Sequence, residues 1–267
     1  MWEALQFEFM RHALAAGVLV SISCGIIGVL VVVNRIAMIS GGIAHASYGG
    51  IGLAVFFGIA PFVGAAGFAV VMGLLMGWIS LKQKQRSDAV IGALWAIGMA
   101  IGILFIDLSP GYNVDLMSYL FGSILAVGKQ ELWFMLTIDL LTLATVILFY
   151  KEFLAMSYDE QFAEVTGVPV RALYFLVLTL TSFTVVMLIR VVGLILVIAL
   201  LTIPPYISVQ FTSTLGKMMG FSILLSILFV TLGLWISYNF NLSSGASIIL
   251  VAGAAFFLSH IFQKNRP

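Results

Sequence analysis

The sequence has few charged residues and only one cysteine. Asp, Glu, Lys and Arg make up 9% of the 267 residues, against about 25% in soluble globular domains. No polar stretch is long enough to form a soluble domain of its own. Cys24 alone excludes a disulfide within the chain, and we expect it to be a small core residue. The formal net charge of +1 gives no basic surface for a nucleic-acid partner.

Hydrophobic residues, by contrast, make up 62% of the chain. A helix needs about 20 apolar residues to cross a membrane, and the runs that have or nearly have that length are 12–33, 39–59, 61–81, 88–106, 131–150, 171–189, 192–210, 219–237 and 245–262. They predict an all-α fold, a polytopic transmembrane helical bundle of eight to nine membrane segments that forms one domain over residues 1–267. The number of membrane segments stays open, because the runs 171–189 and 192–210 are tightly joined at 191–193 and could be partly re-entrant. Pro204 and Pro205 break the second of these two runs, so we expect it to line protein or a wet cavity.

The basic residues are divided unevenly between alternate joints of these segments. With the N-terminus outside, the outer ones are Arg11, Lys129 and Arg190, and the inner ones are Arg35, Lys82, Lys84, Arg86, Lys151, Arg171, Lys217, Lys264 and Arg266. Cytoplasmic loops of membrane proteins carry the excess of Lys and Arg. The sequence therefore predicts that the N-terminus lies outside and the C-terminus lies in the cytoplasm.

Two connections between the segments are long enough to contain helices of their own. On the outer side, residues 113–127 form an apolar stretch too short to span, and we expect a short interfacial or re-entrant helix there. On the cytoplasmic side, residues 157–168 predict a short helix that Ser157 or Asp159 caps and that Gly167 ends. Its acidic character argues against binding to anionic headgroups and favours docking onto another protein.

One histidine lies deep in the second apolar run. His45 stands among very small residues, in the sequence Ser-Gly-Gly-Ile-Ala-His-Ala-Ser-Tyr-Gly-Gly-Ile-Gly over positions 40–52, where neighbouring helices can approach closely. An ionisable group at membrane depth is costly unless it has a partner, lines a cavity or carries function. His45 is therefore either a packing residue bonded to a neighbouring carbonyl or a residue on an ion path.

Two more charged residues need partners for the same reason. Asp139 lies inside the fifth run and should face the bundle interior, paired with a basic or backbone group, or else act as a metal or relay ligand. Arg190 closes the sixth run near the outer side, where we expect it to reach the headgroups or to pair with Asp107 or Asp115.

Four stretches, in this order along the chain, resemble motifs of one known family. They are 39–53 with its His-Ala-Ser core, 114–127, 158–168, and Val-Gly-Leu-Ile-Leu-Val-Ile-Ala-Leu-Leu-Thr-Ile-Pro-Pro over 192–205. The chain resembles, over nearly its whole length, the membrane permeases of bacterial zinc, manganese and iron ABC importers (ABC-3), and it is most similar to the zinc uptake permease. The resemblance implies the fold of a metal ABC importer permease in the bacterial plasma (inner) membrane.

The resemblance also implies partners and site residues. It implies a second permease copy, as a homodimer or a pair of related permeases, two cytoplasmic ABC ATPase subunits and an extracytoplasmic metal-binding protein. The helix at 157–168 would be the coupling helix held in a groove of the ATPase, through Asp159, Glu160, Phe162, Ala163 and Gly167. Glu160 stands where the family often has proline.

The cargo implied by the resemblance is zinc (Zn²⁺), or manganese (Mn²⁺) or iron(II) (Fe²⁺), with His45 as its ligand. The family usually has an aspartate four residues before this histidine, but here that position is Gly41. We expect fewer protein ligands, for example His45 from each of two subunits, because imidazole suits zinc. A carboxylate from another segment, a different substrate and a different partner permease are the alternatives.

The predicted function is thus the permease of an ATP-driven importer for a divalent transition metal. The chain has no glycine-rich phosphate loop with a lysine, so we expect it not to be an enzyme and expect ATP to bind the partner subunit. No permanently bound cofactor is expected. The alternative is a gradient-driven secondary transporter or channel for metal cations, but the paired intramembrane carboxylates and inverted repeats typical of that class are not evident.

Overall fold

A computed structural model describes residues 6–83, 87–109 and 116–263, and in these ranges every regular element is a helix. The elements are α1 (Glu8–Val33), α2 (Ala37–Phe56), α3 (Pro61–Lys82), α4 (Ser87–Asp107), α5 (Leu116–Phe121), η2 (Ile124–Ala126), α6 (Lys129–Leu148), α7 (Tyr150–Tyr158), α8 (Glu160–Val165), α9 (Val170–Val192), α10 (Val197–Phe211), α11 (Leu215–Phe240) and α12 (Ser244–Gln263). Within the described residues, eight helices are long and apolar enough to cross a membrane, and α10 is a shorter apolar helix of 15 residues. The predicted all-α transmembrane bundle is confirmed.

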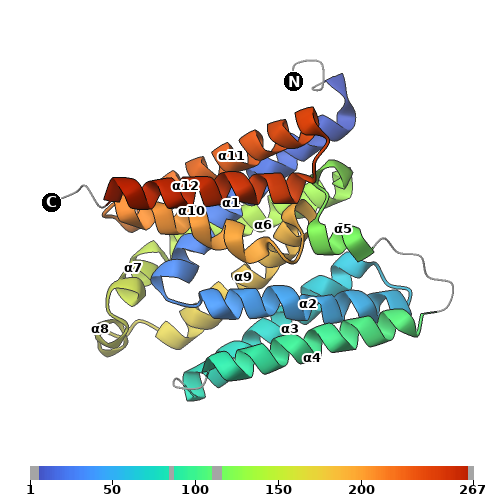
Figure 1. Cartoon of the computed structure of the whole chain (residues 1–267). Coiled ribbons are helices and arrows are strands. Elements are labelled where there is room, and N and C mark those ends of the chain that lie inside the picture. Colours follow the sequence, from blue (N-terminus) through green and yellow to red (C-terminus); the bar gives the residue numbers. More distant parts are fainter. Residues whose placement is uncertain (1–5, 84–86, 110–115, 264–267) are drawn as a thin grey trace.

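The helices form two packed groups. In Figure 1, α2, α3 and α4 lie together below the group that contains α1, α9, α10, α11 and α12. Every residue from 23 to 31 of α1 is buried, so this helix is covered on all sides by its neighbours. A helix segment that is apolar all round, as this part of α1 is, is typical of such a central position. The second helix, α2, is almost as enclosed: from 39 to 54 only His45 and Leu53 are partly exposed.

The prolines of α10 free two carbonyls, which α1 covers. A proline at position i cannot donate to the carbonyl at i−4, so Pro204 and Pro205 leave the carbonyls of Leu200 and Leu201 without that donor. The thiol of Cys24 donates to the carbonyl oxygen of Leu200 at 3.2 Å. Gly28 lies against the carbonyl of Leu201 so closely that a Cβ there would collide with it. The predicted small core residue Cys24 is buried and also bonds α10. The expected break at Pro204 and Pro205 is wrong, because α10 continues through both prolines as one helix.

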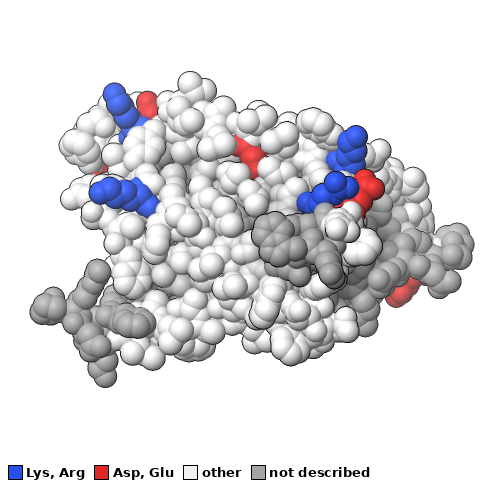
Figure 2. All heavy atoms as spheres, turned by 90° about the horizontal axis from the view of Figure 1, so that it is seen from above, with Lys and Arg blue, Asp and Glu red and all other residues white. Residues whose placement is uncertain are grey.

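The two ends of the bundle differ. In Figure 1, α5 lies at one end and α7 and α8 lie at the other, where α12 ends. We refer to them as the α5 end and the α8 end. Figure 2 shows the Lys and Arg side chains of the viewed face gathered toward the two ends, with a largely uncharged region between them. This distribution matches an apolar belt in a membrane with charged residues near both surfaces.

At the α5 end, the single short helix expected at 113–127 is instead two pieces. In its described part, α5 stops at Gly122, which has a φ of +72°, and η2 follows. Backbone bonds join this stretch to the junction of α9 and α10: Leu194 N donates to Tyr119 O at 3.0 Å, and Ser123 N donates to Arg190 O at 3.1 Å. Gly122 and Gly193 touch backbone to backbone, which leaves no room for a Cβ at either position. A continuous helix could not make these contacts, because its own amides would be used internally.

Candidate functional site

His45 lies in the middle of α2 and is partly exposed in the otherwise buried stretch around it. Its imidazole ring is stacked on the indole of Trp95 from α4, with 4.0 Å between the ring centroids and 10° between the ring planes. The Nδ1 atom of His45 is buried and has no hydrogen-bond partner. The alternative of a packing histidine bonded to a neighbouring carbonyl gains no support from Nδ1. An imidazole nitrogen without a hydrogen-bond partner can bind a ligand in the tautomer that leaves it without a proton.

Glycines bring α2 and α4 into backbone contact beside this histidine. A Cβ on Gly98 would lie 2.7 Å from the Cα of Ala46, and a Cβ on Gly49 would lie 2.7 Å from the carbonyl oxygen of Gly98. One turn further along, Gly52 lies directly against Gly102. Small residues allow such close crossings of membrane helices. The crossing fixes the position of the α4 side chains relative to His45.

Gly41 occupies the position one turn before His45. A Cβ added there would lie 2.7 Å from the Cδ1 atom of Ile198, so a side chain of α10 already fills the space beside this glycine. Among the described residues, no group of three or more His, Cys, Asp or Glu side chains is placed to hold a metal ion. The prediction that another segment supplies a carboxylate to His45 gains no support from these residues.

Asp139 faces the bundle interior, as predicted. Its side chain on α6 is 2% exposed and accepts a short hydrogen bond from the hydroxyl of Ser23 on α1. The partner is thus a hydroxyl, whereas a basic or backbone group was expected. The second carboxyl oxygen has no hydrogen-bond partner, and neither has the hydroxyl of Thr142 one turn along α6. The pair ties α6 to the central helix.

The cytoplasmic connection predicted at 157–168 contains α8 and the end of α7. Asp159 is the N-cap of α8, and its Oδ1 accepts from the backbone N–H of Phe162 at 2.9 Å. Gly167 has a φ of +89° and follows the last turn, as expected for a residue that ends a helix. Ala163 is fully buried, whereas Phe162 is 65% exposed. The neighbouring apolar side chains Tyr158 and Val165 are 93% and 87% exposed.

Glu160 lines a pocket, whereas the apolar side chains of Phe162 and Val165 on the same helix are exposed. This open pocket of about 380 Å³ lies between α3, α8 and α9 and is also lined by Trp78, Lys82, Glu164 and Arg171. The pocket has two acidic and two basic side chains, so the acidic character noted in the sequence is balanced here by cations from α3 and α9. Phe162 and Val165 of α8, in contrast, are left largely exposed by the described part of the chain.

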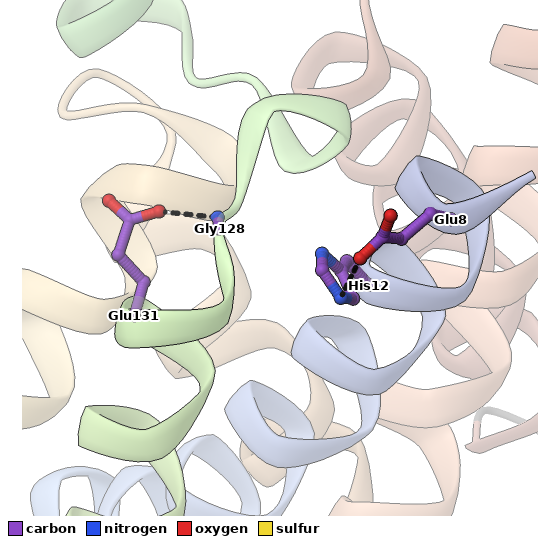
Figure 3. Close-up of polar contacts among 4 residues, drawn as sticks. All are labelled: Glu8, His12, Gly128 and Glu131. Carbon is purple, nitrogen blue, oxygen red and sulfur yellow. Dashed lines mark hydrogen bonds and ion pairs between the residues drawn. The ribbon is translucent and has the colours of Figure 1, made fainter.

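At the α5 end, Glu131 caps α6 and joins it to α9. Its Oε2 accepts from the backbone N–H of Gly128 at 2.8 Å, which caps α6 (Figure 3). Its Oε1 forms an ion pair with the Arg190 guanidinium of α9 at 2.6 Å. The predicted partner Asp107 is therefore wrong, and Asp115 lies outside the described residues. On α1, Glu8 and His12 form a second pair at 3.7 Å (Figure 3).

Sequence reasoning missed Trp95 and Ile198. The sequence places both in apolar runs, where an aromatic or aliphatic residue is ordinary, and only the helix crossings bring them beside His45 and Gly41. The dense glycines of α2 and α4 were a usable signal for the crossing. They did not say which side chains would meet there.

The fold and these sites define a polytopic helical membrane protein with a partly exposed histidine in the middle of α2 and an exposed short helix at one end. Residues 6–263 match the ABC 3 transport family, so the chain belongs to that family. It is 51% identical to an uncharacterized membrane protein of Synechocystis sp., a match over 99% of this chain and 94% of that one. It is 34% identical to the manganese transport system membrane protein MntC of Halalkalibacterium halodurans, over 99% of this chain and 90% of that one.

A solved structure agrees with this assignment. The chain is similar, with a TM-score of 0.87 and 30% identity, to a chain in the structure of PsaBC from Streptococcus pneumoniae in complex with Fab, over 96% of this chain and 93% of that one. The resemblance to the ABC-3 metal permeases is confirmed, whereas its finer part, the similarity to the zinc permease, is not, since the relative named for a metal is a manganese transport protein. The chain is the permease of an ABC transporter and not an enzyme, and ATP hydrolysis belongs to a separate subunit.

Proposed function

We propose that this permease imports a divalent transition metal and that His45 contacts the metal on its path. The observation that carries the proposal is the Nδ1 atom of His45, a buried imidazole nitrogen with no partner in the middle of a membrane helix. An intramembrane ionisable residue without a structural partner is a candidate for the transport path. Imidazole is also the commonest metal ligand among the side chains.

The relatives and the ligand chemistry favour different metals. MntC, which is 34% identical, is named for manganese transport, whereas an imidazole without carboxylates suits zinc better than manganese. We place manganese first and zinc second, because MntC matches 99% of this chain and a relative that matches the whole chain is a stronger guide to the metal than one ligand. Iron(II) is the third candidate.

Two copies of the permease would give the metal two imidazoles. With Gly41 in place of the usual aspartate, one chain offers a single described ligand at this point. A homodimer would bring a second His45, and waters would complete the coordination sphere. A pair of related permeases is the alternative, in which the second chain supplies its own ligands.

We propose that α8 is the coupling helix for the ATPase. The exposed side chains of Phe162 and Val165 on α8, with Tyr158 at the end of α7, would enter a groove of that subunit, and Asp159 and Gly167 would set the two ends of α8. Phe149 belongs to the junction of α6 with α7, and Thr166 to Pro169 separate α8 from α9. Motion of α8 would therefore be passed to α6 and α9, and would shift the bundle between two packings.

The α8 end would face the cytoplasm of a bacterial cell, with the N-terminus outside. Among the described residues, Arg35, Lys82, Lys151, Arg171 and Lys217 belong to the joints on that side, against Arg11, Lys129 and Arg190 on the other. The excess agrees with the positive-inside rule. An extracytoplasmic binding protein would then deliver the metal at the α5 end.

Metal uptake by cells that lack their own importers tests the proposal. The permease, its ATPase and its binding protein are expressed together, and uptake of radioactive manganese, zinc and iron(II) is measured. We expect manganese uptake that His45→Ala reduces by about tenfold or more, as loss of a metal ligand does. The matched control His12→Ala removes a histidine bonded only to Glu8 near the end of α1, and it should leave uptake within about twofold of normal.

Uptake of none of the three metals by a complex that is present in the membrane would contradict the proposed function. Full uptake by His45→Ala would show instead that metal passes without this imidazole.

A further inference from the structure

Trp95 covers one face of the His45 ring. The two rings are nearly parallel, and the centroid distance of 4.0 Å is close for stacked aromatic groups. Metal ions bind an imidazole nitrogen in the plane of the ring, so the indole does not occupy the coordination position itself. It fixes the plane in which that position lies.

The indole is itself held firmly. Its Nε1–H donates to the thioether sulfur of Met99, one turn further along α4, at 3.2 Å. Three residues from Trp95, Gly98 touches the backbone of Ala46, the residue next to His45. The sulfur contact holds the indole on α4, and the backbone contact of Gly98 with Ala46 holds α4 against α2.

In most metal sites a hydrogen bond orients the histidine ring, and here the stacked indole of Trp95 can orient the ring of His45. A metal-ligating histidine is usually oriented by a carboxylate, carbonyl or water that bonds its second nitrogen. In this chain the residue one turn before His45 is a glycine, with Ile198 packed beside it. Stacking on Trp95 is the described contact that orients the ring.

We propose that Trp95 is a positioning residue for the metal ligand His45, and that it fixes the direction in which the imidazole nitrogen meets the ion. The inference rests on the proposed function, since it deepens the role of His45. Its consequence is that Trp95 controls the concentration at which metal occupies the path. Removal of the indole lets the ring rotate, which weakens metal binding.

Transport by Trp95 variants is the first test, and it uses the complete complex. Mutation of a residue that orients a metal ligand without touching the metal typically lowers metal affinity by about 10- to 100-fold. We therefore expect Trp95→Leu to raise the KM for manganese by about tenfold, with a smaller change in the maximal rate. Trp95→Phe keeps an aromatic face and should restore the KM to within about threefold. The control Trp133→Leu replaces a 62% exposed tryptophan of α6 and should change neither constant.

Fluorescence gives a readout that does not depend on transport. The chain has five tryptophans, so a variant with Trp2, Trp78, Trp133 and Trp235 changed to Phe reports on Trp95 alone. Addition of Mn²⁺ or Zn²⁺ to this purified permease should change the Trp95 emission in a saturable way, because the ion binds the ring stacked on it. His45→Ala in the same background should abolish the response.

The outcomes separate this inference from the proposed function. If the unmodified complex takes up no metal, the proposed function fails. If His45→Ala abolishes uptake but Trp95→Leu leaves the KM unchanged, or if metal leaves the Trp95 emission unchanged while uptake depends on His45, Trp95 is a packing residue and the inference is wrong. If Trp95→Leu does not reach the membrane, Trp95→Phe and the emission of Trp95 decide the question.

Discussion

The crossing of α2 with α4 and the short helix α8 are built in opposite ways. The crossing is closed by backbone contacts at glycines, and among the described side chains of α2 and α4 the buried polar atom without a hydrogen-bond partner is Nδ1 of His45. Helix α8 has one buried anchor, Ala163, and leaves its larger apolar side chains exposed. Under the proposed function, the crossing would frame the path of the metal and α8 would bind the ATPase. The difference predicts that changes in the crossing affect folding, whereas changes in α8 affect coupling.

The largest effect should come from Gly52→Ala. The added Cβ would collide with the carbonyl of Gly102, and both atoms belong to helix backbones that cannot move independently. Overpacking of this kind costs about 3 kcal/mol, which corresponds to a fall of about 10 °C in the apparent melting temperature. The measurement is thermal unfolding of the purified permease in detergent.

Gly92→Ala is the matched control, since the same change on α4 meets nothing within 4 Å. It should leave the melting temperature unchanged or raise it slightly, because alanine favours the helix by about 1 kcal/mol over glycine. Equal melting temperatures for the two variants would show that α2 and α4 are not in backbone contact.

Phe162→Ala should impair coupling without affecting folding. An aromatic anchor buried in a partner's pocket is commonly worth about 2 kcal/mol, so the affinity for the ATPase should fall by about tenfold or more. Co-purification with the ATPase and metal uptake measure the loss. Phe257→Ala, at a 70% exposed position of α12, should bind the ATPase normally. If both variants bind it equally well, α8 is not the docking element.

Asp159→Ala should have a smaller effect on the same helix. Loss of an N-cap costs about 1 kcal/mol, which corresponds to about fivefold in the local folding equilibrium of α8. Hydrogen exchange over residues 160–167 should become faster by that factor. Asp159→Asn keeps a capping oxygen and should exchange at nearly the normal rate, and equally fast exchange in the two variants would rule out the cap as the cause.

The smallest effect should come from adding a carboxylate beside His45. Gly41→Asp alone meets Ile198, whereas the double variant with Ile198→Ala makes room for it. A carboxylate suits manganese better than imidazole does, so the ratio of manganese to zinc uptake should rise by about threefold, or about 0.7 kcal/mol. The single variant Ile198→Ala is the control. An unchanged ratio in the double variant would place the metal away from position 41.

Local patterns in the sequence predicted most of the fold. Apolar runs located the membrane helices, and the tight joint at 191–193 indicated the short helix α10 with its two prolines. The cap at Asp159 and the stop at Gly167 also follow from neighbours within a few residues. These features are decided by hydropathy, capping and backbone conformation, which act over one or two turns.

Contacts between distant segments could not be predicted in the same way. The break of the outer stretch at Gly122 depends on backbone contact with Gly193, and the partner of Arg190 is Glu131 because α6 begins beside the end of α9. Trp95 meets His45 only because glycines let α4 cross α2 at that height. The sequence indicated that such residues needed partners, but the helix arrangement decided which ones they have.

Transport by the purified permease in liposomes tests the central claim most directly, namely that this helical bundle moves metal only when a separate ATPase drives it. Liposomes that contain the permease with its ATPase and binding protein should accumulate manganese when ATP is supplied, and should accumulate none without ATP. The permease alone should move no metal. Nucleotide-independent flux of manganese or zinc through the permease alone would contradict the account and indicate a channel or a gradient-driven transporter.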